Sequence, residues 1–411
     1  MRLTRAMHNR HNQRGAVSLF IVIFATLLMT IVTVSFLRLM IQNQQEASAQ
    51  DLSQSAYDSA QAGVQDAERA LVRYEACVQG NTCTNLDTAT WNNCNGIISS
   101  QLDPSQSQTI PEVPVSQTGD GQTASQNLNQ AYTCVKVALD TDNVTGSVSS
   151  LGQKLIPLAG VSSFTTVEVD WFTRDDLGTT NNYSVNLVNP ATTPLPLIQQ
   201  YNTVTGQGWS PSRPSVLRVQ LMQYSDNGFK LTDFDDTNAG SQSNSNTVFL
   251  YPTGFTGVNP GGYTPNVLAF SADARRVPIG QPYAANCLGS LSGGGYSCSE
   301  LLTLPTPING GNRTAYLRLT PLYNATHFQV KLLSSNNVNS VVQFHNVQPA
   351  IDSTGRANDL FRRVLTRVDL LNDSLPYPTD AVDLTGPFCK DFAVTNDANQ
   401  YGAINTSTCK P

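Results

Sequence analysis

Charged residues are scarce in this chain of 411 residues. They make up 13% of the sequence, against roughly 25% in ordinary soluble domains, and Ser, Thr, Asn and Gln stand in their place. A neutral polar surface of this kind is typical of an exported protein rather than of a cytosolic enzyme. Hydrophobic residues still reach 40%, so the composition argues against a disordered chain.

Acidic residues are absent from the first 41 positions, which hold Arg2, Arg5, Arg10, Arg14 and Arg38. All 30 acidic residues follow, against 19 of the 24 basic ones. An acidic body that is poor in lysine lacks the basic face that a phosphate backbone requires. We therefore expect no nucleic-acid partner, and we interpret the first four arginines as a signal that keeps the N-terminus in the cytoplasm.

Recognised catalytic motifs are missing as well. The chain has no P-loop, no G-x-G-x-x-G, no G-x-S-x-G and no H-E-x-x-H, and each of those patterns is tied to a specific chemistry. His327 and His345 are the two histidines beyond the N-terminal region, and both lie in strand-like stretches, where an exposed strand residue is a commoner role than a general base. We predict that the chain is not an enzyme and binds no cofactor.

Metal-binding patterns are weak. No C-x2-C pair occurs, which disfavours a zinc site. The acidic run "DFDD" holds Asp233, Asp235 and Asp236, and carboxylates are the hard oxygen ligands that calcium prefers. The run is not an EF-hand, because the required Gly and the final Glu are missing, so a solvated turn is the preferred interpretation and calcium the alternative.

Helix-breaking residues are absent from a long N-terminal stretch. No proline precedes Pro104, and no glycine lies between Gly15 and Gly63. Residues 16–37 are 22 consecutive uncharged residues, and as a helix they would be about 33 Å long, enough to cross a bilayer. A cleavable secretion signal has a shorter apolar core, of about 7–15 residues. We predict a basic leader over 1–15 and a transmembrane helix over 16–41.

The helical pattern continues past the apolar segment. Over 42–78 a stripe of Ala, Leu and Val recurs every three or four residues, which indicates an amphipathic continuation. One helix from residue 16 to about residue 74 is therefore expected, and a membrane span followed by a separate stalk is the alternative. Because the stripe is rich in alanine, it suits close packing on a sheet or on another helix.

Eight cysteines all follow the apolar segment, and an even number beyond a membrane favours disulfides in an oxidising compartment. Their spacing suggests three groups. These are Cys77, Cys83, Cys94 and Cys134; Cys287 and Cys298; and Cys389 and Cys409.

The rest of the chain alternates apolar and polar residues in short runs typical of strands. We predict a variable, disulfide-containing loop region over 79–160 and a β-rich extracellular region over 161–411, with a split into two subdomains near 254–311 left open. The last four runs, 315–322, 327–333, 340–347 and 361–370, are close enough for an antiparallel meander. A sheet packed on the long helix gives an α+β fold.

The N-terminal region resembles a known family. A basic leader, Gly15, the apolar run "RGAVSLFIVIFATLLMTIVTV" and the Ala-rich "SAYDSAQAGVQDAERAL" are similar to type IV pilins, and most of all to minor pilins of the PilX-like sort. The resemblance covers about residues 10–75. It implies cleavage after Gly15 by a prepilin peptidase, leaving Ala16 first, and packing against other pilin subunits through the helix.

One position departs from that family. Pilins usually carry Glu at the fifth residue after the cut, where it partners the terminal amine of a neighbour, and this chain has Phe20 there. Either the subunit sits at a fibre tip or it never enters a fibre.

These observations favour a minor pilin-like subunit, with the fibre tip as one place that it could occupy. We expect a single-pass membrane protein with a cytoplasmic N-terminus, whose extracellular β-rich body serves adhesion to a host-cell or other surface, or pilus assembly. The alternatives are a stand-alone membrane-anchored adhesin and a signal-anchored glycan-active enzyme.

Overall fold

The structure is a computed structural model that describes part of the chain. The described residues are 14–79, 88–97, 112–115, 129–178, 183–187, 208–223, 245–254, 266–269, 283–308 and 315–370.

The described residues form one long helix, two short 3₁₀ turns and 15 strands. In chain order they are α1 (Arg14–Gln79), η1 (Thr88–Thr90), β1 (Val113–Pro114), β2 (Ala131–Thr141), β3 (Val144–Val148), β4 (Lys154–Pro157), β5 (Phe164–Thr173), η2 (Arg174–Leu177), β6 (Val216–Gln223), β7 (Ser245–Gly254), β8 (Asn266–Ala269), β9 (Tyr283–Cys287), β10 (Tyr296–Ile308), β11 (Ala315–Leu322), β12 (Thr326–Leu333), β13 (Val341–Val342), β14 (Phe344–Ala357) and β15 (Leu360–Arg367).

The chain divides into two compact units. Unit 1 comprises Met1–Ala70, Cys83–Lys136 and Asp352–Leu365, and unit 2 comprises Leu71–Thr82, Val137–Ile351 and Thr366–Pro411. The predicted α+β class is confirmed, because a long N-terminal helix and a large β body are both present.

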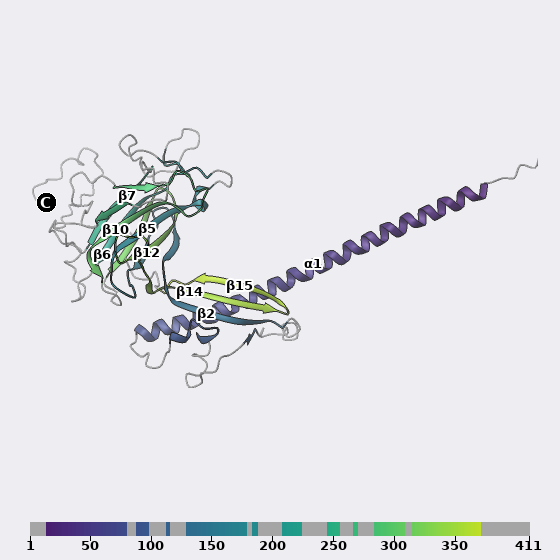
Figure 1. The fold of residues 1–411 in the computed structure, drawn as a ribbon, viewed down its shortest axis with the longest axis horizontal. Helices are drawn as coiled ribbons and strands as arrows, with labels where there is room; N and C mark the ends of the chain where they lie inside the picture. The colour runs from purple at the N-terminus through teal and green to yellow at the C-terminus, as the bar shows by residue number, and fades with distance from the viewer. Residues whose placement is uncertain are drawn as a thin grey trace, which may run out of the picture. The chain divides into compact units, whose positions relative to one another are not determined.

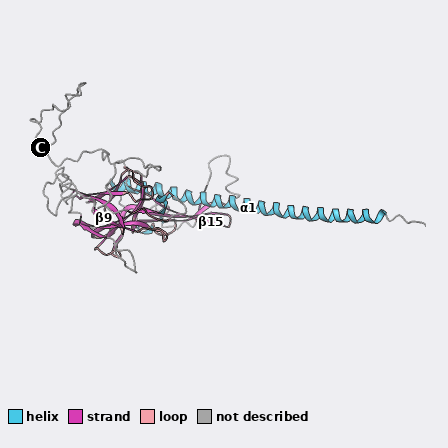
Figure 2. Ribbon diagram, turned by 90° about the horizontal axis from the view of Figure 1, so that it is seen from above, coloured by secondary structure: helices cyan, strands magenta, loops and turns pink. Residues whose placement is uncertain are grey.

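Helix α1 is unbroken over 66 residues, which makes it about 100 Å long. Figure 2 shows it as a single helix. Its interior has no proline and only one glycine, Gly63, so every backbone carbonyl in the interior has a donor four residues on. The prediction of one helix through the apolar and amphipathic segments is confirmed.

In unit 1 the second half of α1 lies beside a four-stranded sheet of order β1-β2-β14-β15 (Figure 1). Ala56, Ala60, Val64 and Ala67 are buried there, and their spacing of three or four residues places them on one helix face. The alanine stripe therefore packs on a sheet, as its composition predicts.

Two glycines allow the helix and the sheet to approach closely. A Cβ on Gly355 of β14 would lie 2.2 Å from the backbone oxygen of Ala56 and 2.2 Å from the backbone nitrogen of Ala60. A Cβ on Gly63 of α1 would lie 2.5 Å from Ser353 Oγ and 2.7 Å from Val135 Cγ2. Only glycine fits at these positions with the present spacing.

Unit 2 is built on an 11-stranded mixed sheet whose main path is β13-β12-β5-β10-β9-β7-β6-β11-β4, with β3 beside β12 and β8 beside β10. The β7–β9 and β8–β10 pairs are parallel, and the other pairs with assigned register are antiparallel. One face of this sheet builds the main apolar core, which includes Trp171, Phe164 and Phe328. A smaller cluster in the same unit comprises Trp209, Val216 and Tyr251. On β12, for example, Phe328, Val330 and Leu332 point into the core, as strand alternation requires.

The predicted meander of the last four runs is only partly right. β12 pairs with β13, which lies in the run 340–347, and β14 pairs with β15, but the four runs do not form one continuous meander. β11 pairs with β6 and β4, whereas β12 pairs with β5, β13 and β3, so these two strands are not neighbours. β14 and β15 belong to the other sheet. Alternation along a strand specifies which side chains are buried, but it does not select the partner strand.

The structure also places strands in two of the predicted regions. The region 79–160, predicted to be a variable loop region, contains β2, β3 and β4 near its C-terminal end, and β2 covers the alternating, strand-like run 132–139. The described residues within 254–311 contribute β8, β9 and β10 to the large sheet, and a split into subdomains near this region stays a prediction. Glycine and proline around these strands suggested loops, whereas burial in the sheet overrides that local preference.

Candidate membrane-spanning helix and candidate functional residues

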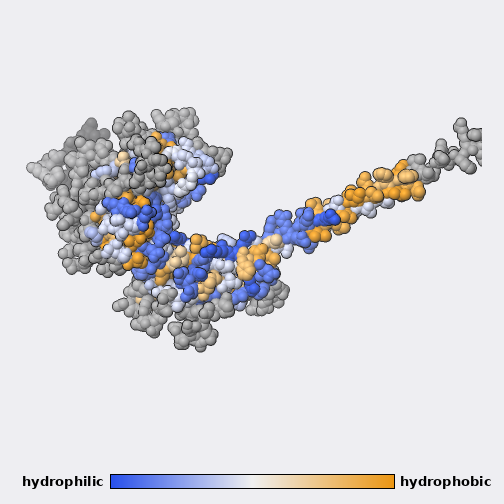
Figure 3. Space-filling view, viewed as in Figure 1, coloured by the Kyte–Doolittle hydropathy of each residue, from blue (hydrophilic) through white to orange (hydrophobic). Residues whose placement is uncertain are grey.

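The first half of α1 presents an apolar surface that no described residue covers. Every side chain from residue 18 to residue 51 is exposed, and the exposed set includes Phe20, Phe24 and Phe36 at 67%, 72% and 67%. Figure 3 shows this half as a continuous hydrophobic surface that gives way to hydrophilic residues. By length and composition this helix can cross a membrane.

Four hydroxyl groups within the apolar half are satisfied by the helix itself. Thr26, Thr30, Thr33 and Ser35 donate to the carbonyl oxygens of Ile23, Leu27, Met29 and Ile31. In hydrocarbon an unpaired hydroxyl costs free energy because no water is present to bond it. Because each hydroxyl bonds back to its own helix, these four residues are compatible with a lipid environment.

The residues of the predicted cleavage site lie in the first turn of α1. Gly15 and Ala16 follow Arg14, where the helix begins. Phe20 lies one turn later on the exposed apolar surface. Cleavage after Gly15 stays a prediction.

Polar contacts hold α1 to its sheet within unit 1. Buried Ser353 on β14 donates its hydroxyl to the backbone oxygen of Ala60 at 2.7 Å. The Tyr132 hydroxyl on β2 donates to Asp66 Oδ2 at 2.9 Å. Burial first, and then the hydrogen bond to Asp66, raise the pKa of Tyr132, so this phenol stays a donor at physiological pH.

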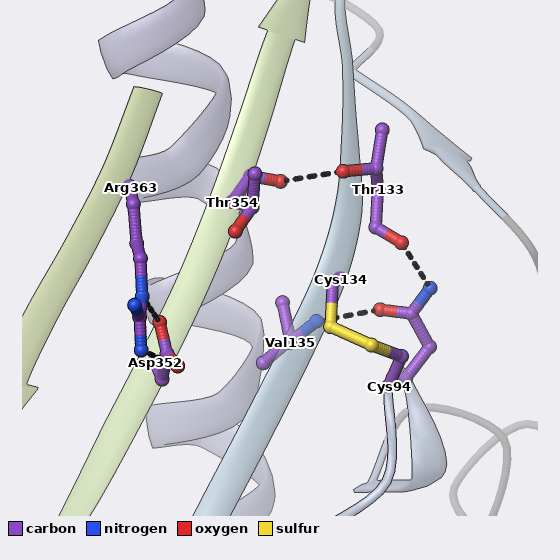
Figure 4. The surroundings of a disulfide bond; sticks show 8 residues. Cys94, Thr133, Cys134, Val135, Asp352, Thr354 and Arg363 are labelled. Atoms are coloured by element: carbon purple, nitrogen blue, oxygen red, sulfur yellow. Dashed lines mark hydrogen bonds and ion pairs between the residues drawn. A yellow bond between two sulfur atoms is a disulfide. The ribbon is translucent and has the colours of Figure 1, made fainter. Parts of the chain in front are cut away.

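A disulfide between Cys94 and Cys134 joins the segment after η1 to β2 (Figure 4). The adjoining Asn95 side chain adds two bonds to the same strand, accepting from Val135 N at 2.8 Å and donating to Thr133 O at 3.2 Å. On the neighbouring strands, Arg363 Nε and Nη2 each donate to an Asp352 oxygen at 2.6 Å. Unit 1 is therefore cross-linked covalently and by charge-assisted bonds.

The predicted cysteine grouping agrees with both disulfides whose partners are described. Cys287 on β9 bonds Cys298 on β10, directly across the strand pair, and Cys94–Cys134 falls within the first group. Cys77 is also disulfide-bonded. Cys83, Cys389 and Cys409 lie outside the described residues.

The two histidines lie on strands and pair with carboxylates in unit 2. His327 Nδ1 is 2.7 Å from Asp176 Oδ1, and His345 Nδ1 is 2.8 Å from Asp140 Oδ1. Asp176 also accepts the backbone N–H of Thr173 at 2.7 Å and that of His327 at 3.0 Å. This carboxylate is thus an acceptor that joins the turn η2 to β12.

Sequence patterns did not single out a cluster of buried ionisable groups in unit 2. Lys331 Nζ on β12 lies 3.1 Å from Glu168 Oε2 and 3.3 Å from Asp170 Oδ2, both on β5. Glu168 and Asp170 lie in the run "TVEVDWF", which has the pattern of an ordinary alternating strand. Charged residues at the polar positions of such a strand would normally face water. Burial is a property of what packs over a strand, so local sequence offered no signal here.

Glu300 on β10 is a second unexpected acid. It is 2% exposed, and its Oε2 has no hydrogen-bond partner among the described residues. It lies directly across from Val169 of the core. Burial raises the pKa of Glu300 to about 9, because desolvation disfavours the charged form. At neutral pH this side chain is therefore a neutral acid.

Within the described residues, no group of three or more His, Cys, Asp and Glu side chains could hold a metal ion. The calcium candidates Asp233, Asp235 and Asp236 lie outside the described part of the chain, so that prediction stays open.

Comparison with protein-family models, with curated proteins and with solved structures finds no match to this chain.

Proposed function

We propose that the chain is a minor subunit of a type IV pilus-like system, anchored in a membrane by α1 and displaying an extracellular β-rich body for adhesion or pilus assembly. The observation that supports this most is the difference between the two halves of α1. Its first half is an exposed apolar helix, and its second half buries one face on a sheet, with no break in the helix between the two halves.

That difference suits a subunit that exchanges one apolar environment for another. In a membrane the exposed half contacts lipid, and in a fibre the same surface contacts the helices of neighbouring subunits. Close packing at Gly63 and Gly355 keeps the second half rigidly attached to its sheet during such a transfer. A helix that served only as an anchor would not require this continuity.

Immunogold labelling of cells and of sheared filaments tests the proposal. Label on filaments, at the end or along the shaft, supports a pilin-like subunit. Label confined to the cell envelope contradicts it and favours a stand-alone anchored adhesin. Phe20 is compatible with both outcomes, because neither a tip subunit nor an adhesin outside a fibre has to partner the terminal amine of a neighbour.

The N-terminus offers a second test. Mass spectrometry of the exported protein is expected to find Ala16 as the first residue, after cleavage by a prepilin peptidase. An intact Met1 on the exported chain would contradict processing.

The role of position 20 can be tested with two variants. Phe20→Glu restores the carboxylate of a fibre subunit and is expected to increase the amount of this chain in sheared filaments if the wild type occupies only the tip. Phe20→Leu is the matched control, since it keeps an apolar side chain and should leave that amount unchanged.

A further inference from the structure

Three ionisable side chains meet on the face of the large sheet that lies opposite its apolar core. On β5, Glu168 and Asp170 alternate with the core residues Val167, Val169 and Trp171. On β12, Lys331 lies between the core residues Val330 and Leu332. The three groups therefore share the other face of two hydrogen-bonded strands.

The strand register holds the lysine against both acids. Lys331 lies directly across from Glu168, and Asp170 lies across from Gln329, one diagonal step away. The lysine Nζ is 3.1 Å from Glu168 Oε2 and 3.3 Å from Asp170 Oδ2. β5 has β10 on its other side, with Ser299 opposite Asp170, so the acids sit on a central strand that cannot shift.

The two acids are almost fully buried. Glu168 is 5% exposed and Asp170 is 6% exposed, whereas the Lys331 side chain is 26% exposed. Burial, followed for Glu168 by the charge of Asp170, raises the pKa of both carboxyls, and Lys331 opposes this rise. Bulk water, which normally solvates an amine and a carboxylate and keeps them apart as ions, has little access to the acids.

An amine held against a carboxylic acid, with a second carboxylate beside both, has the components needed to form an amide. The amine is the nucleophile, the acid carbon is the electrophile, and the second carboxylate accepts and returns protons. Fixed geometry removes the entropic cost of bringing the two groups together, and burial removes the water that would hold them as an unreactive ammonium and carboxylate.

We propose that Lys331 and Asp170 form an intramolecular isopeptide bond, with Glu168 as the proton-transfer group. The diagonal register favours Asp170 as the electrophile. Diagonal partners lie roughly 7–8 Å apart, a span that the long lysine side chain and the short aspartate side chain can bridge. Glu168 lies directly opposite Lys331, too close for two long side chains to be joined without folding back.

The step balances without any co-reactant. Lys331 begins as an ammonium, Glu168 as a carboxylate and Asp170 as a carboxylic acid. Lys331 Nζ gives one proton to Glu168 and attacks Asp170 Cγ. The N–C bond forms, the Cγ–OH bond breaks, and water leaves with that hydroxyl and a second Nζ proton. The third proton stays on the amide nitrogen, Glu168 ends as the neutral acid, and no group is oxidised or reduced.

Unit 2 contains a second lysine–aspartate pair that serves as an internal control. Lys154 Nζ lies 2.7 Å from Asp369 Oδ2, closer than Lys331 lies to either acid. The Asp369 side chain is 41% exposed, so water has ready access to its carboxylate. Proximity alone would link this pair, whereas the proposed mechanism leaves it as an ion pair.

Mass spectrometry of the full-length protein, extracted in detergent and with its disulfides reduced, tests the proposal. The chain is expected to be lighter by one water molecule. A tryptic digest should contain residues 155–174 joined to residues 319–356, with no cleavage after Lys331. Release of residues 155–174 also requires cleavage after Lys154, so the same peptide shows that the control lysine is unmodified.

Other peptide masses would contradict the proposed bond. Separate peptides 155–174, 319–331 and 332–356, all at unmodified mass, would overturn the proposal. Fragment ions that place the link on Glu168 would overturn the choice of Asp170. These measurements use the wild-type protein, so they do not depend on whether a variant folds.

Two variants then assign the roles. Lys331→Arg keeps the positive charge but removes the nucleophile, so the joined peptide should disappear. Glu168→Gln keeps a hydrogen-bonding side chain but cannot take the proton, so the joined peptide should form about a hundredfold more slowly or worse. An unchanged rate in Glu168→Gln would rule out proton transfer by Glu168. The bond can form whether or not the chain enters a fibre, so its test is independent of the proposed function.

Discussion

The two units differ in how closely their residues pack and in whether they bury acidic side chains. Unit 1 packs small residues so closely that backbones meet, and its acids, such as Asp66 and Asp352, remain near the surface with a tyrosine or arginine partner. Unit 2 fills its core with large side chains, such as Trp171 and Phe328, yet buries Glu168, Asp170 and Glu300. The stability of unit 1 should therefore depend on side-chain volume, and the stability of unit 2 on the ionisation of its buried acids.

The largest expected effect is that of Glu300 on stability. Its ionisation should make the unfolding free energy of unit 2, but not that of unit 1, depend on pH. Its pKa is raised from 4.5 to about 9 in the fold, so its contribution to stability is complete below about pH 4.5 and is lost as pH rises toward 9. Relative to Glu300→Gln, the wild type should lose roughly 4 kcal/mol of unfolding free energy between pH 5 and pH 8.

Hydrogen exchange measured across that pH range checks this prediction, because it reports each unit separately. Parallel pH profiles of the wild type and Glu300→Gln would show that Glu300 ionises normally. Asp66→Asn in unit 1 is the matched comparison and should leave the unit 2 profile unchanged.

Removing its disulfide should lower the stability of unit 1 slightly more than removing the Cys287–Cys298 disulfide lowers the stability of unit 2. Cys94 and Cys134 are 40 residues apart, and Cys287 and Cys298 are 11 apart. In the chain-entropy account, replacing each pair with alanine costs about 4 and about 3 kcal/mol. Local hydrogen exchange of each double variant provides the measurement, and a larger loss for Cys287 and Cys298 would contradict the order.

Added volume should damage unit 1 selectively. Gly355→Ala places a methyl group against the fixed backbone of Ala56 and Ala60, and we expect a loss of about 3 kcal/mol in the protection of β14 and α1. Gly289→Ala in unit 2 is the control, since its Cβ would meet nothing within 4 Å. Equal effects of the two variants would show that the close approach of α1 and β14 is not limiting.

The smallest effect is expected from single hydroxyl groups. Tyr132→Phe removes a 2.9 Å bond to a carboxylate and should cost about 1.5 kcal/mol in unit 1, whereas Tyr296→Phe removes a 3.3 Å bond to a backbone carbonyl and should cost about 0.5 kcal/mol. Thermal unfolding of both variants tests the difference, and the prediction fails if Tyr296→Phe is the more destabilising.

Part of the fold could be read from local pattern. The unbroken helix followed from the lack of proline and glycine, and its alanine stripe indicated close packing. The strands of unit 2 followed from alternation, and Cys287–Cys298 from spacing. In each case the physical cause acts between residues that are near in sequence, so the pattern is visible without the fold.

The remaining features depend on residues that are distant in sequence. β14 and β15 lie in the same sheet as β2, and β11 and β12 are not neighbours. Alternation could not predict this pairing, because many registers bury the same alternating face equally well. The sequence also did not reveal the approach of Lys331 to Glu168 and Asp170, since a charged residue on a strand is ordinarily solvated.

The sequence by itself determined that α1 is one helix with an apolar half and an amphipathic half, because helix formation and lateral amphipathicity are set over three or four residues. Only the tertiary structure decided which strands that helix packs against and which acids lose their water. Those outcomes depend on pairing between segments more than 100 residues apart, such as α1 with β14, and no local pattern encodes the free energy of such contacts.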